Sequence, residues 1–206
     1  MLTTNRKLTA VCAYLAVAVV VLQVALFLVS WIITAATPEI NVRSLLNNEG
    51  IRWFFGSFID NVASPPLVWL VTLAMAYGAL RQSGLLRMMT NPQPRTYRQT
   101  FALRIVLAEL LLFVLAIVVV AFVPHAALLS VTGQLFPSSF SSCLIPIIAF
   151  CVALTSITFG ILTATMKTVP EVFQTLCRGV AYAAPLIVLH VLASELYFSL
   201  RYVFMW

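Results

Sequence analysis

Long hydrophobic runs, separated by short polar stretches, dominate the sequence. Residues 8–38 contain no charged side chain, and this run is far longer than the roughly 7–15 apolar residues of a signal peptide. A helix needs about 20 apolar residues to cross the hydrocarbon core of a bilayer. We therefore predict an all-α integral membrane protein with a single membrane domain over residues 1–206. The pattern predicts about five transmembrane helices, over residues 8–33, 66–86, 105–123, 143–166 and 179–200.

A shorter segment before the second predicted span has the periodicity of an amphipathic helix. Its hydrophobic residues recur at intervals of three and four, which places them on one helical face. They are Ile51, Phe54, Phe55, Phe58, Ile59 and Val62. We predict that residues 48–63 form a helix in the outer membrane interface, with Asn48 as its N-cap. Its expected interfacial anchors are Trp53, Phe54, Phe55 and Phe58.

Two connections between the predicted spans differ in character. Residues 87–101 are polar and contain Pro92 and Pro94, so we predict a cytoplasmic linker there. Thr168 and Glu171 have the spacing of a capping box, and hydrophobic residues recur after them with helical periodicity. A short cytoplasmic helix is therefore expected to lead into the last span.

Composition and charge favour a membrane location over a soluble one. Hydrophobic residues make up 62% of the chain and charged residues only 9%, whereas a soluble domain has roughly a quarter of its residues charged. Nine of the twelve Lys and Arg residues fall in the N-terminal segment and in the second and fourth connections. By the positive-inside rule, the N-terminus is predicted in the cytoplasm and the C-terminus outside. We assign the positive charge to orientation in a bacterial-type inner membrane, and we expect no nucleic-acid partner.

Polar side chains inside the predicted spans are the first candidates for a functional site, because burying them in hydrocarbon is costly. They are Gln23, Glu109, His190 and Glu195. His190 could bond the backbone of a neighbouring helix, or it could be a ligand or a proton relay. His190 and Glu195 are five residues apart, which separates them by about 140° around a helix. The two are therefore not expected to form one site within their own helix.

Each of the other candidates also has a purely structural interpretation. Gln23 is expected to form a helix–helix hydrogen bond. Glu109 could pair with a nearby basic residue such as Arg104, and Glu195 could pair with Arg201 or reach the outer interface. A transport role would require these groups to meet in one cavity.

Motifs of enzymes and metal sites do not occur in the sequence. It contains two histidines, and it contains no His-Glu-X-X-His, Gly-X-Ser-X-Gly or glycine-rich phosphate loop. The four cysteines, which form no Cys-X-X-Cys pair, are expected to be small buried hydrophobic residues. They are Cys12, Cys143, Cys151 and Cys177. We predict that the chain is not an enzyme and binds no cofactor or metal ion.

Two segments resemble a known family. Residues 44–55 read Ser-Leu-Leu-Asn-Asn-Glu-Gly-Ile-Arg-Trp-Phe-Phe, and residues 83–86 read Ser-Gly-Leu-Leu. They resemble the p-aminobenzoyl-glutamate transporter (AbgT) family, in which a helix with an LL..EG..W pattern precedes a span ending in SGLL. Weaker similarity extends along most of the chain, as far as residues 186–195.

The resemblance implies a transporter scaffold without its transport site. Members of the family are usually dimeric secondary transporters, whose transport domain is built from re-entrant helical hairpins. The first hairpin would lie where this chain has only residues 87–101, and the second would follow residue 206. Our first hypothesis is a non-catalytic membrane scaffold or accessory subunit that packs against itself or another membrane protein. The second is a reduced ion-coupled transporter of p-aminobenzoyl-glutamate-like or sulfonamide-like solutes.

Overall fold

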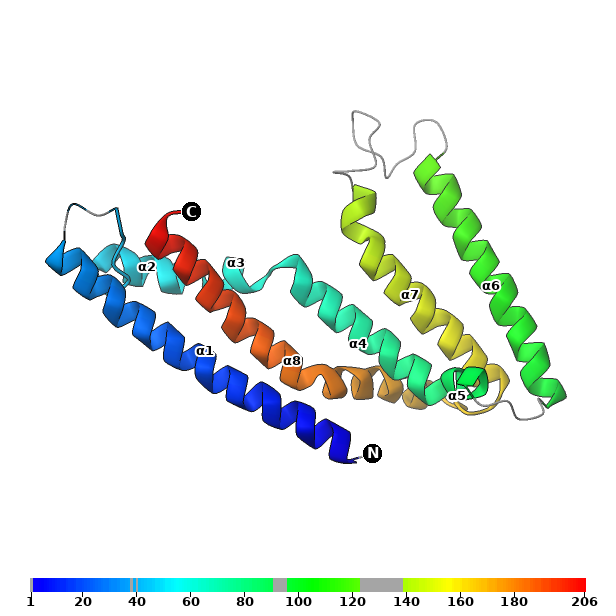
Figure 1. Ribbon diagram of the computed structural model, residues 1–206. Helices are drawn as coiled ribbons and strands as arrows, with labels where there is room; N and C mark the ends of the chain where they lie inside the picture. The colour runs from blue at the N-terminus through cyan, green and yellow to red at the C-terminus, as the bar shows by residue number, and fades with distance from the viewer. Residues whose placement is uncertain (1, 38, 40, 91–95, 123–138) are drawn as a thin grey trace. The chain divides into compact units, whose positions relative to one another are not determined.

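Helices form all the regular secondary structure in the part of the chain that the computed structural model describes, which is residues 2–37, 39, 41–90, 96–122 and 139–206 (Figure 1). In chain order they are α1 (Leu2–Ala36), α2 (Asn48–Gly56), α3 (Phe58–Val62), α4 (Pro65–Ser83), α5 (Leu85–Thr90), α6 (Tyr97–Phe122), α7 (Ser139–Leu162) and α8 (Val169–Phe204).

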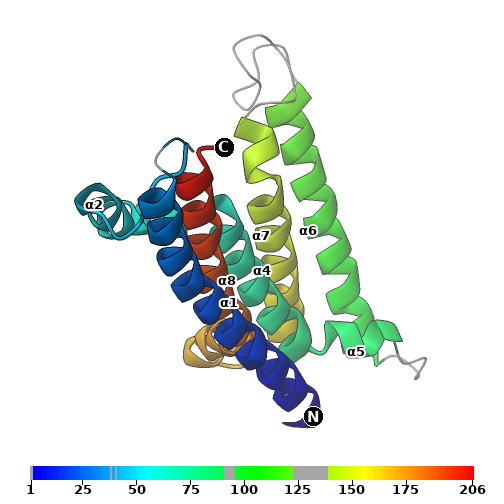
Figure 2. The ribbon, with the colours of Figure 1, turned by 60° about the vertical axis from the view of Figure 1, so that its left-hand side comes forward.

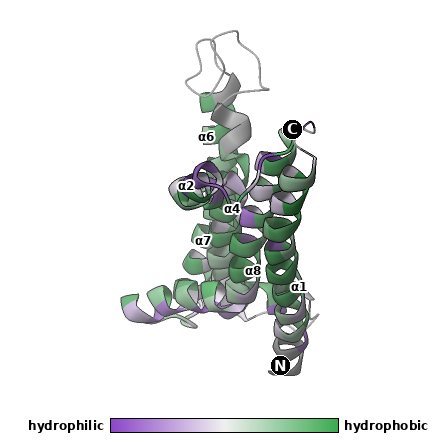
Figure 3. Cartoon of the chain, turned by 90° about the vertical axis from the view of Figure 1, so that its left-hand side faces the viewer, coloured by the Kyte–Doolittle hydropathy of each residue, from purple (hydrophilic) through white to green (hydrophobic). Residues whose placement is uncertain are grey.

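Among the described residues, four helices are long and apolar enough to cross a membrane. They cover Lys7–Ala36, Tyr97–Val120, Cys143–Leu162 and Val169–Phe204. Figure 3 shows hydrophobic residues along much of α1 and α8. The protein is therefore an all-α, multi-pass membrane protein. The predicted span 66–86 corresponds largely to α4, which is not one of these four helices. Two prolines at its start, and Arg81 and Gln82 near its end, lower its mean hydropathy.

The predicted interfacial helix over residues 48–63 is divided into α2 and α3. Ser57 separates the two helices, and its backbone N–H closes α2 by donating to the Trp53 carbonyl at 2.8 Å. The N-cap is Asn47 rather than Asn48, because the Asn47 Oδ1 accepts a 2.6 Å hydrogen bond from the Gly50 N–H. The hydrophobic pattern thus predicted the helical segment but not its division.

A glycine divides the predicted span 66–86. Gly84 has a φ of +81°, a left-handed conformation that ends α4, and α5 begins at the next residue. The predicted linker 87–101 is correspondingly shorter, because α5 continues to Thr90 and α6 begins at Tyr97. Residues 91–95 of this linker lie outside the described residues, as does residue 123 at the end of the predicted span 105–123.

The two ends of the connection before α8 also differ from the prediction. The span predicted over residues 143–166 ends earlier, at Leu162, and Ala164 adopts a left-handed φ of 58° in the turn that follows. The short helix predicted after Thr168 and the last span are one continuous helix, α8. The Thr168 hydroxyl accepts from the Glu171 N–H at 3.4 Å, and the Glu171 carboxylate accepts from the Lys167 N–H at 2.7 Å. Thr168 and Glu171 therefore cap α8, as their spacing predicted.

The chain divides into two compact units, and the division falls within α4 and α8. Unit 1 comprises Met1–Val68 and Ala183–Trp206. In this unit α1 and the C-terminal part of α8 run side by side (Figures 1 and 2). Leu26, Leu45 and Val203 form its buried core. Gly50 lies so close to the backbone of Ser44 and Leu45 that a Cβ atom would not fit there.

Unit 2 comprises Trp69–Tyr182. Within it, α6 and α7 form an antiparallel pair (Figure 1). The buried core of the unit is formed by Leu85, Ala102, Val106 and Phe159. Gly78 of α4 and Gly179 of α8 lie against each other, and a Cβ on either glycine would collide with the backbone of the other helix. The two helices therefore pack with their backbones in direct contact.

Candidate functional site

A buried carboxylate pairs with an amide in unit 1. Glu195 of α8 is 6% exposed and Asn61 of α3 is 5% exposed. The Asn61 Nδ2 donates to both carboxylate oxygens of Glu195 at 3.4 Å. Arg201, the basic partner considered from the sequence, instead donates its Nε to the Trp206 carbonyl at 2.9 Å. The expected pairing of Glu195 with Arg201 is therefore wrong, whereas its place relative to the outer interface stays a prediction.

His190 lies between two hydroxyl groups of the same unit. Its Nε2 is 3.1 Å from the Ser64 Oγ and 3.2 Å from the Ser194 Oγ. Ser194 is one turn further along α8, whereas Ser64 directly precedes α4. The sequence-based expectation of a backbone partner for His190 is wrong, because both partners are side chains.

Gln23 joins α1 to α8. Its Nε2 donates to the Ser199 Oγ at 2.9 Å, which confirms the predicted helix–helix hydrogen bond. The Gln23 Oε1 is buried and has no hydrogen-bond partner among the described residues. Because a buried carbonyl without a donor is costly, the Gln23 Oε1 offsets part of the stabilisation that the bond to Ser199 provides.

These three contacts lie along α8 in unit 1. Among the described residues no hydrogen bond links one contact to the next, and we refer to the set as the network of unit 1. His190 and Glu195 do not bond each other, as their separation around the helix predicted. Their partners Ser64 and Asn61 are three residues apart, so both candidates bond side chains of the short segment around the α3–α4 junction. The network combines an imidazole, a carboxyl group and hydroxyls, which can hold a proton or fix the pairing of helices.

Glu109, the fourth candidate, belongs to unit 2 and forms a separate site. Its Oε1 accepts a hydrogen bond from the Thr158 hydroxyl of α7 at 3.3 Å. Its Oε2 is buried and lacks a partner among the described residues. The side chain of Arg104, the suggested partner, is exposed, and no ion pair joins it to Glu109 in this part of the chain. The proposed pairing with a loop arginine is therefore wrong.

The aromatic anchors of the predicted interfacial helix divide into two groups. Trp53 stacks on Tyr202 of α8 with ring centroids 4.3 Å apart, and Phe54 packs edge-on against Phe27 of α1 at 5.1 Å. Phe55 is 75% exposed and Phe58 is 41% exposed. The first pair thus attaches the segment to unit 1, and the second pair is free to contact lipid.

The cysteines also divide between the interior and the surface. Cys12 and Cys151 are buried, as expected, but Cys143 and Cys177 are exposed. All four are free thiols. An exposed thiol in an apolar helix still faces hydrocarbon when the helix lies in a bilayer, so exposure from the rest of the chain does not conflict with an apolar environment.

Sequence reasoning did not identify the partners of the network. Asn61 lies in the segment 48–63, which was assigned to the interface by its hydrophobic periodicity, and Ser64 directly follows it. Ser194 lies four residues after His190, and Ser199 lies four residues after Glu195. On a helix this spacing places each serine on the same face as the ionisable group, which could have indicated a polar face of α8. Comparison of this chain with protein-family models, curated proteins and solved structures finds no match.

Proposed function

We propose that the chain is a non-catalytic membrane scaffold or accessory subunit that packs against a second copy or another membrane protein. The observation that carries this proposal is the network of unit 1, where Gln23, His190 and Glu195 all bond side chains from other segments. Interhelical hydrogen bonds of this kind fix which helices pair. Side chains that already bond neighbouring segments are less available to bind a transported solute.

The resemblance of residues 44–55 to the AbgT family supports the same proposal, because these residues build the core of unit 1. Leu45 is buried in that core, and Gly50 allows α2 to approach the Leu45 backbone. Trp53 stacks on Tyr202 of α8. Three residues of the LL..EG..W pattern, Leu45, Gly50 and Trp53, thus have packing roles, as a derived scaffold domain would require, whereas Leu46 and Glu49 are exposed.

The apolar surface of the long helices is suited to contact with lipid or with a partner helix in the membrane. Large hydrophobic side chains of α1 and α6, such as Val21 and Leu111, are exposed over most of the length of both helices. A bilayer or a partner helix must cover them. We propose a bacterial-type inner membrane, in which this surface contacts lipid and a partner polypeptide.

We further propose five spans, with α4 as the fifth, a cytoplasmic N-terminus and an outer C-terminus. The Arg81 guanidinium near the end of α4 bonds the Tyr77 hydroxyl at 2.9 Å and lies 5.1 Å from the Tyr182 ring centroid. A terminal arginine held in this way can reach the interface while α4 spans the bilayer. Reporter fusions test the orientation, since one inserted after Thr90 should be active in the cytoplasm and one after Trp206 only outside. Reversal of both results would refute the orientation, and reversal of one would refute the span count.

To test the scaffold proposal, the tagged chain is cross-linked in membranes and then purified in mild detergent. We expect a complex with a second copy or with one other membrane polypeptide in constant stoichiometry. A matched purification of an unrelated multi-pass protein controls for adventitious capture. A monomer that gives no cross-linked product at any cross-linker concentration would contradict the proposal.

The unpaired oxygen of Glu109 favours a second candidate function, a reduced ion-coupled transporter. A buried carboxyl oxygen without a donor can bind a proton or a cation in one step of a transport cycle. The candidate solutes are p-aminobenzoyl-glutamate-like or sulfonamide-like compounds, as the family resemblance implies. Uptake into liposomes under a proton or sodium gradient, abolished by Glu109→Gln, would replace the scaffold proposal with this one.

A further inference from the structure

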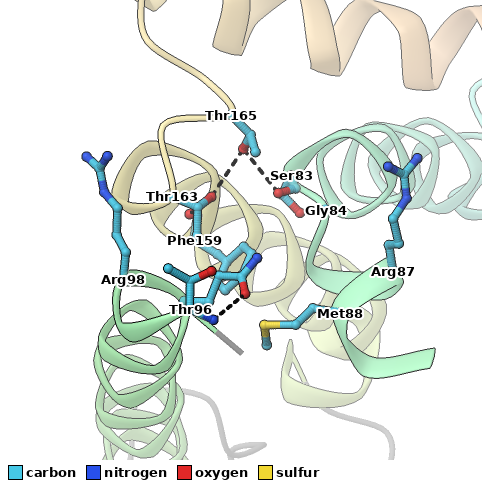
Figure 4. Close-up of a pocket in the computed structure, with 10 residues that line it drawn as sticks. Ser83, Gly84, Arg87, Met88, Thr96, Arg98, Phe159, Thr163 and Thr165 are labelled. Carbon is cyan, nitrogen blue, oxygen red and sulfur yellow. Dashed lines mark hydrogen bonds between the residues drawn. The ribbon is translucent and has the colours of Figure 1, made fainter. Parts of the chain in front are cut away.

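A cleft of about 420 Å³ lies in unit 2, where α4 ends, α6 begins and α7 ends (Figure 4). It contains none of the intramembrane polar residues discussed above. Arg87 of α5 and Arg98 of α6 stand on opposite flanks of it. None of the described residues that line the cleft is acidic, so the two guanidinium groups are not neutralised from within it.

Both arginines have free hydrogen-bond donors. Arg98 uses its Nε to bond the Leu162 carbonyl at 2.9 Å, which leaves both terminal amino groups of its guanidinium available. The Arg87 guanidinium makes no hydrogen bond to the described residues, and its side chain is exposed. Guanidinium groups bind phosphate oxygens in a fork-like geometry with two parallel hydrogen bonds.

The first turn of α6 adds to the positive potential of the cleft. The Gln99 Oε1 accepts from the Thr96 N–H at 3.0 Å, and this arrangement leaves the Gln99 amide N–H groups free to donate. Unpaired backbone N–H groups at the start of a long helix favour a nearby anion. They supplement the two arginines here and would not define a site by themselves.

The floor of the cleft is apolar. Phe159 of α7 belongs to the buried core of unit 2, and Met88 of α5 packs against the same core. A ligand that fits both the charged rim and this floor has an anionic group attached to a hydrophobic body. Inorganic ions match the rim alone.

We propose that this cleft binds a phosphate-bearing anion. The two sources of that chemistry are the headgroup of an anionic phospholipid and a free phosphorylated small molecule. A lipid source fits the proposed orientation, which places Arg87 and Arg98 at the cytoplasmic interface where anionic headgroups lie. The inference rests on the proposed function only for this orientation.

The experiment uses the full chain in detergent, with binding followed by native mass spectrometry and by titration. The probes are short-chain phosphatidylglycerol, short-chain phosphatidylcholine and inorganic phosphate. We expect phosphatidylglycerol to bind and the zwitterionic lipid to bind at least about tenfold more weakly, which corresponds to about 1.4 kcal/mol. The variant Arg87→Gln should weaken phosphatidylglycerol binding by about tenfold, and Arg87→Gln with Arg98→Gln should abolish it.

Arg104→Gln is the matched control, because Arg104 is an exposed arginine of α6 that does not line the cleft. Its binding should equal that of the unmodified chain, and thermal melting should show that Arg87→Gln leaves the fold intact. Binding of phosphatidylglycerol alone identifies a headgroup site, and equal competition by inorganic phosphate identifies a free phosphate ligand. Absence of binding, or equal loss in Arg104→Gln, would overturn the proposal. The reporter fusions do not depend on ligand binding, so they test the proposed topology independently of this experiment.

Discussion

In unit 1, partly or fully buried side chains of α1 and α3 form hydrogen bonds to α8, whereas in unit 2 the backbones of α4 and α8 are in direct contact at two glycines. Gln23 bonds Ser199 across 176 positions, and Asn61 bonds Glu195 across 134. The α4–α8 contact of unit 2 brings Gly78 against Gly179, and the exposed Arg178 guanidinium adds one hydrogen bond to the Gln82 Oε1 at 2.8 Å.

The difference shows two solutions to one physical problem. Helices in a bilayer gain nothing from hiding apolar surface, because lipid is as apolar as their side chains. They associate through close packing, which small residues allow, or through interhelical hydrogen bonds, which average about 0.6 kcal/mol in one membrane protein. Loss of a packing contact should therefore cost more than loss of one hydrogen bond.

The largest effect is expected from adding a single methyl group to the glycine contact of unit 2. In Gly78→Ala the new Cβ meets the backbone of α8, which cannot move aside as a flexible side chain would. Overpacking of this kind typically costs about 1–3 kcal/mol. Thermal unfolding in detergent should show a clear fall in the melting temperature.

Gly56→Ala is the matched control for that substitution. A Cβ at Gly56 has nothing within 4 Å, so this variant should melt at the temperature of the unmodified chain. Equal melting of both alanine variants would show that α4 and α8 do not depend on their close contact.

An intermediate effect is expected from Asn61→Leu. This change removes the hydrogen-bond donor of a buried carboxylate, and such an unsatisfied group costs about 1–3 kcal/mol. Adding Glu195→Met should recover part of the loss, because replacing both partners by apolar groups is close to neutral. The free energy of unfolding of the double variant therefore decides whether the pair stabilises unit 1 through mutual bonding. A double variant less stable than Asn61→Leu alone would contradict this role.

A smaller effect is expected from Gln23→Leu. The hydrogen bond to Ser199 is lost, but the buried Gln23 Oε1, which lacks a partner among the described residues, is removed with it. We expect a change in the free energy of unfolding of no more than about 0.6 kcal/mol. Ser199→Ala, which leaves the whole Gln23 amide buried, should be the more destabilising of the two, and the reverse order would contradict this balance.

The smallest effect on stability is expected from replacing Phe55 and Phe58 together by Ser. Both side chains are exposed, and the Phe55 ring packs against that of its neighbour Phe54, so the free energy of unfolding in detergent should change by no more than about 0.5 kcal/mol. In liposomes the same variant should be cleaved faster between α2 and α3 by protease added outside, because its lipid anchors are lost. Trp53→Ser is the contrasting variant, since losing the stack on Tyr202 should expose the segment in detergent as well.

Long apolar runs predicted the membrane helices well, because apolar length alone decides whether a helix can span a bilayer. Their ends were less predictable. Gly84 ends α4 through a left-handed backbone conformation, and Ser57 separates two helices in a segment of uninterrupted periodicity. Hydrophobic periodicity does not detect either event, because both depend on backbone conformation at one residue.

The site was predictable in part for a similar reason. A polar residue in an apolar run is conspicuous, so Gln23, His190 and Glu195 were identified. Asn61 and Ser64 were not, because they lie where polar residues are expected and acquire their roles only when distant segments meet. The AbgT resemblance and the choice between scaffold and transporter remain predictions.

The hydrogen bond between Gln23 and Ser199 has a consequence for the order in which the chain assembles during synthesis. Unit 2 is continuous in sequence, so its helices can associate as soon as the ribosome has delivered them. Unit 1 needs α8, and α1 must therefore wait in the membrane with Gln23 unpaired while more than a hundred residues are made. During that interval the Gln23 amide lies in the membrane without its Ser199 partner, and only the arrival of α8 supplies that hydrogen bond.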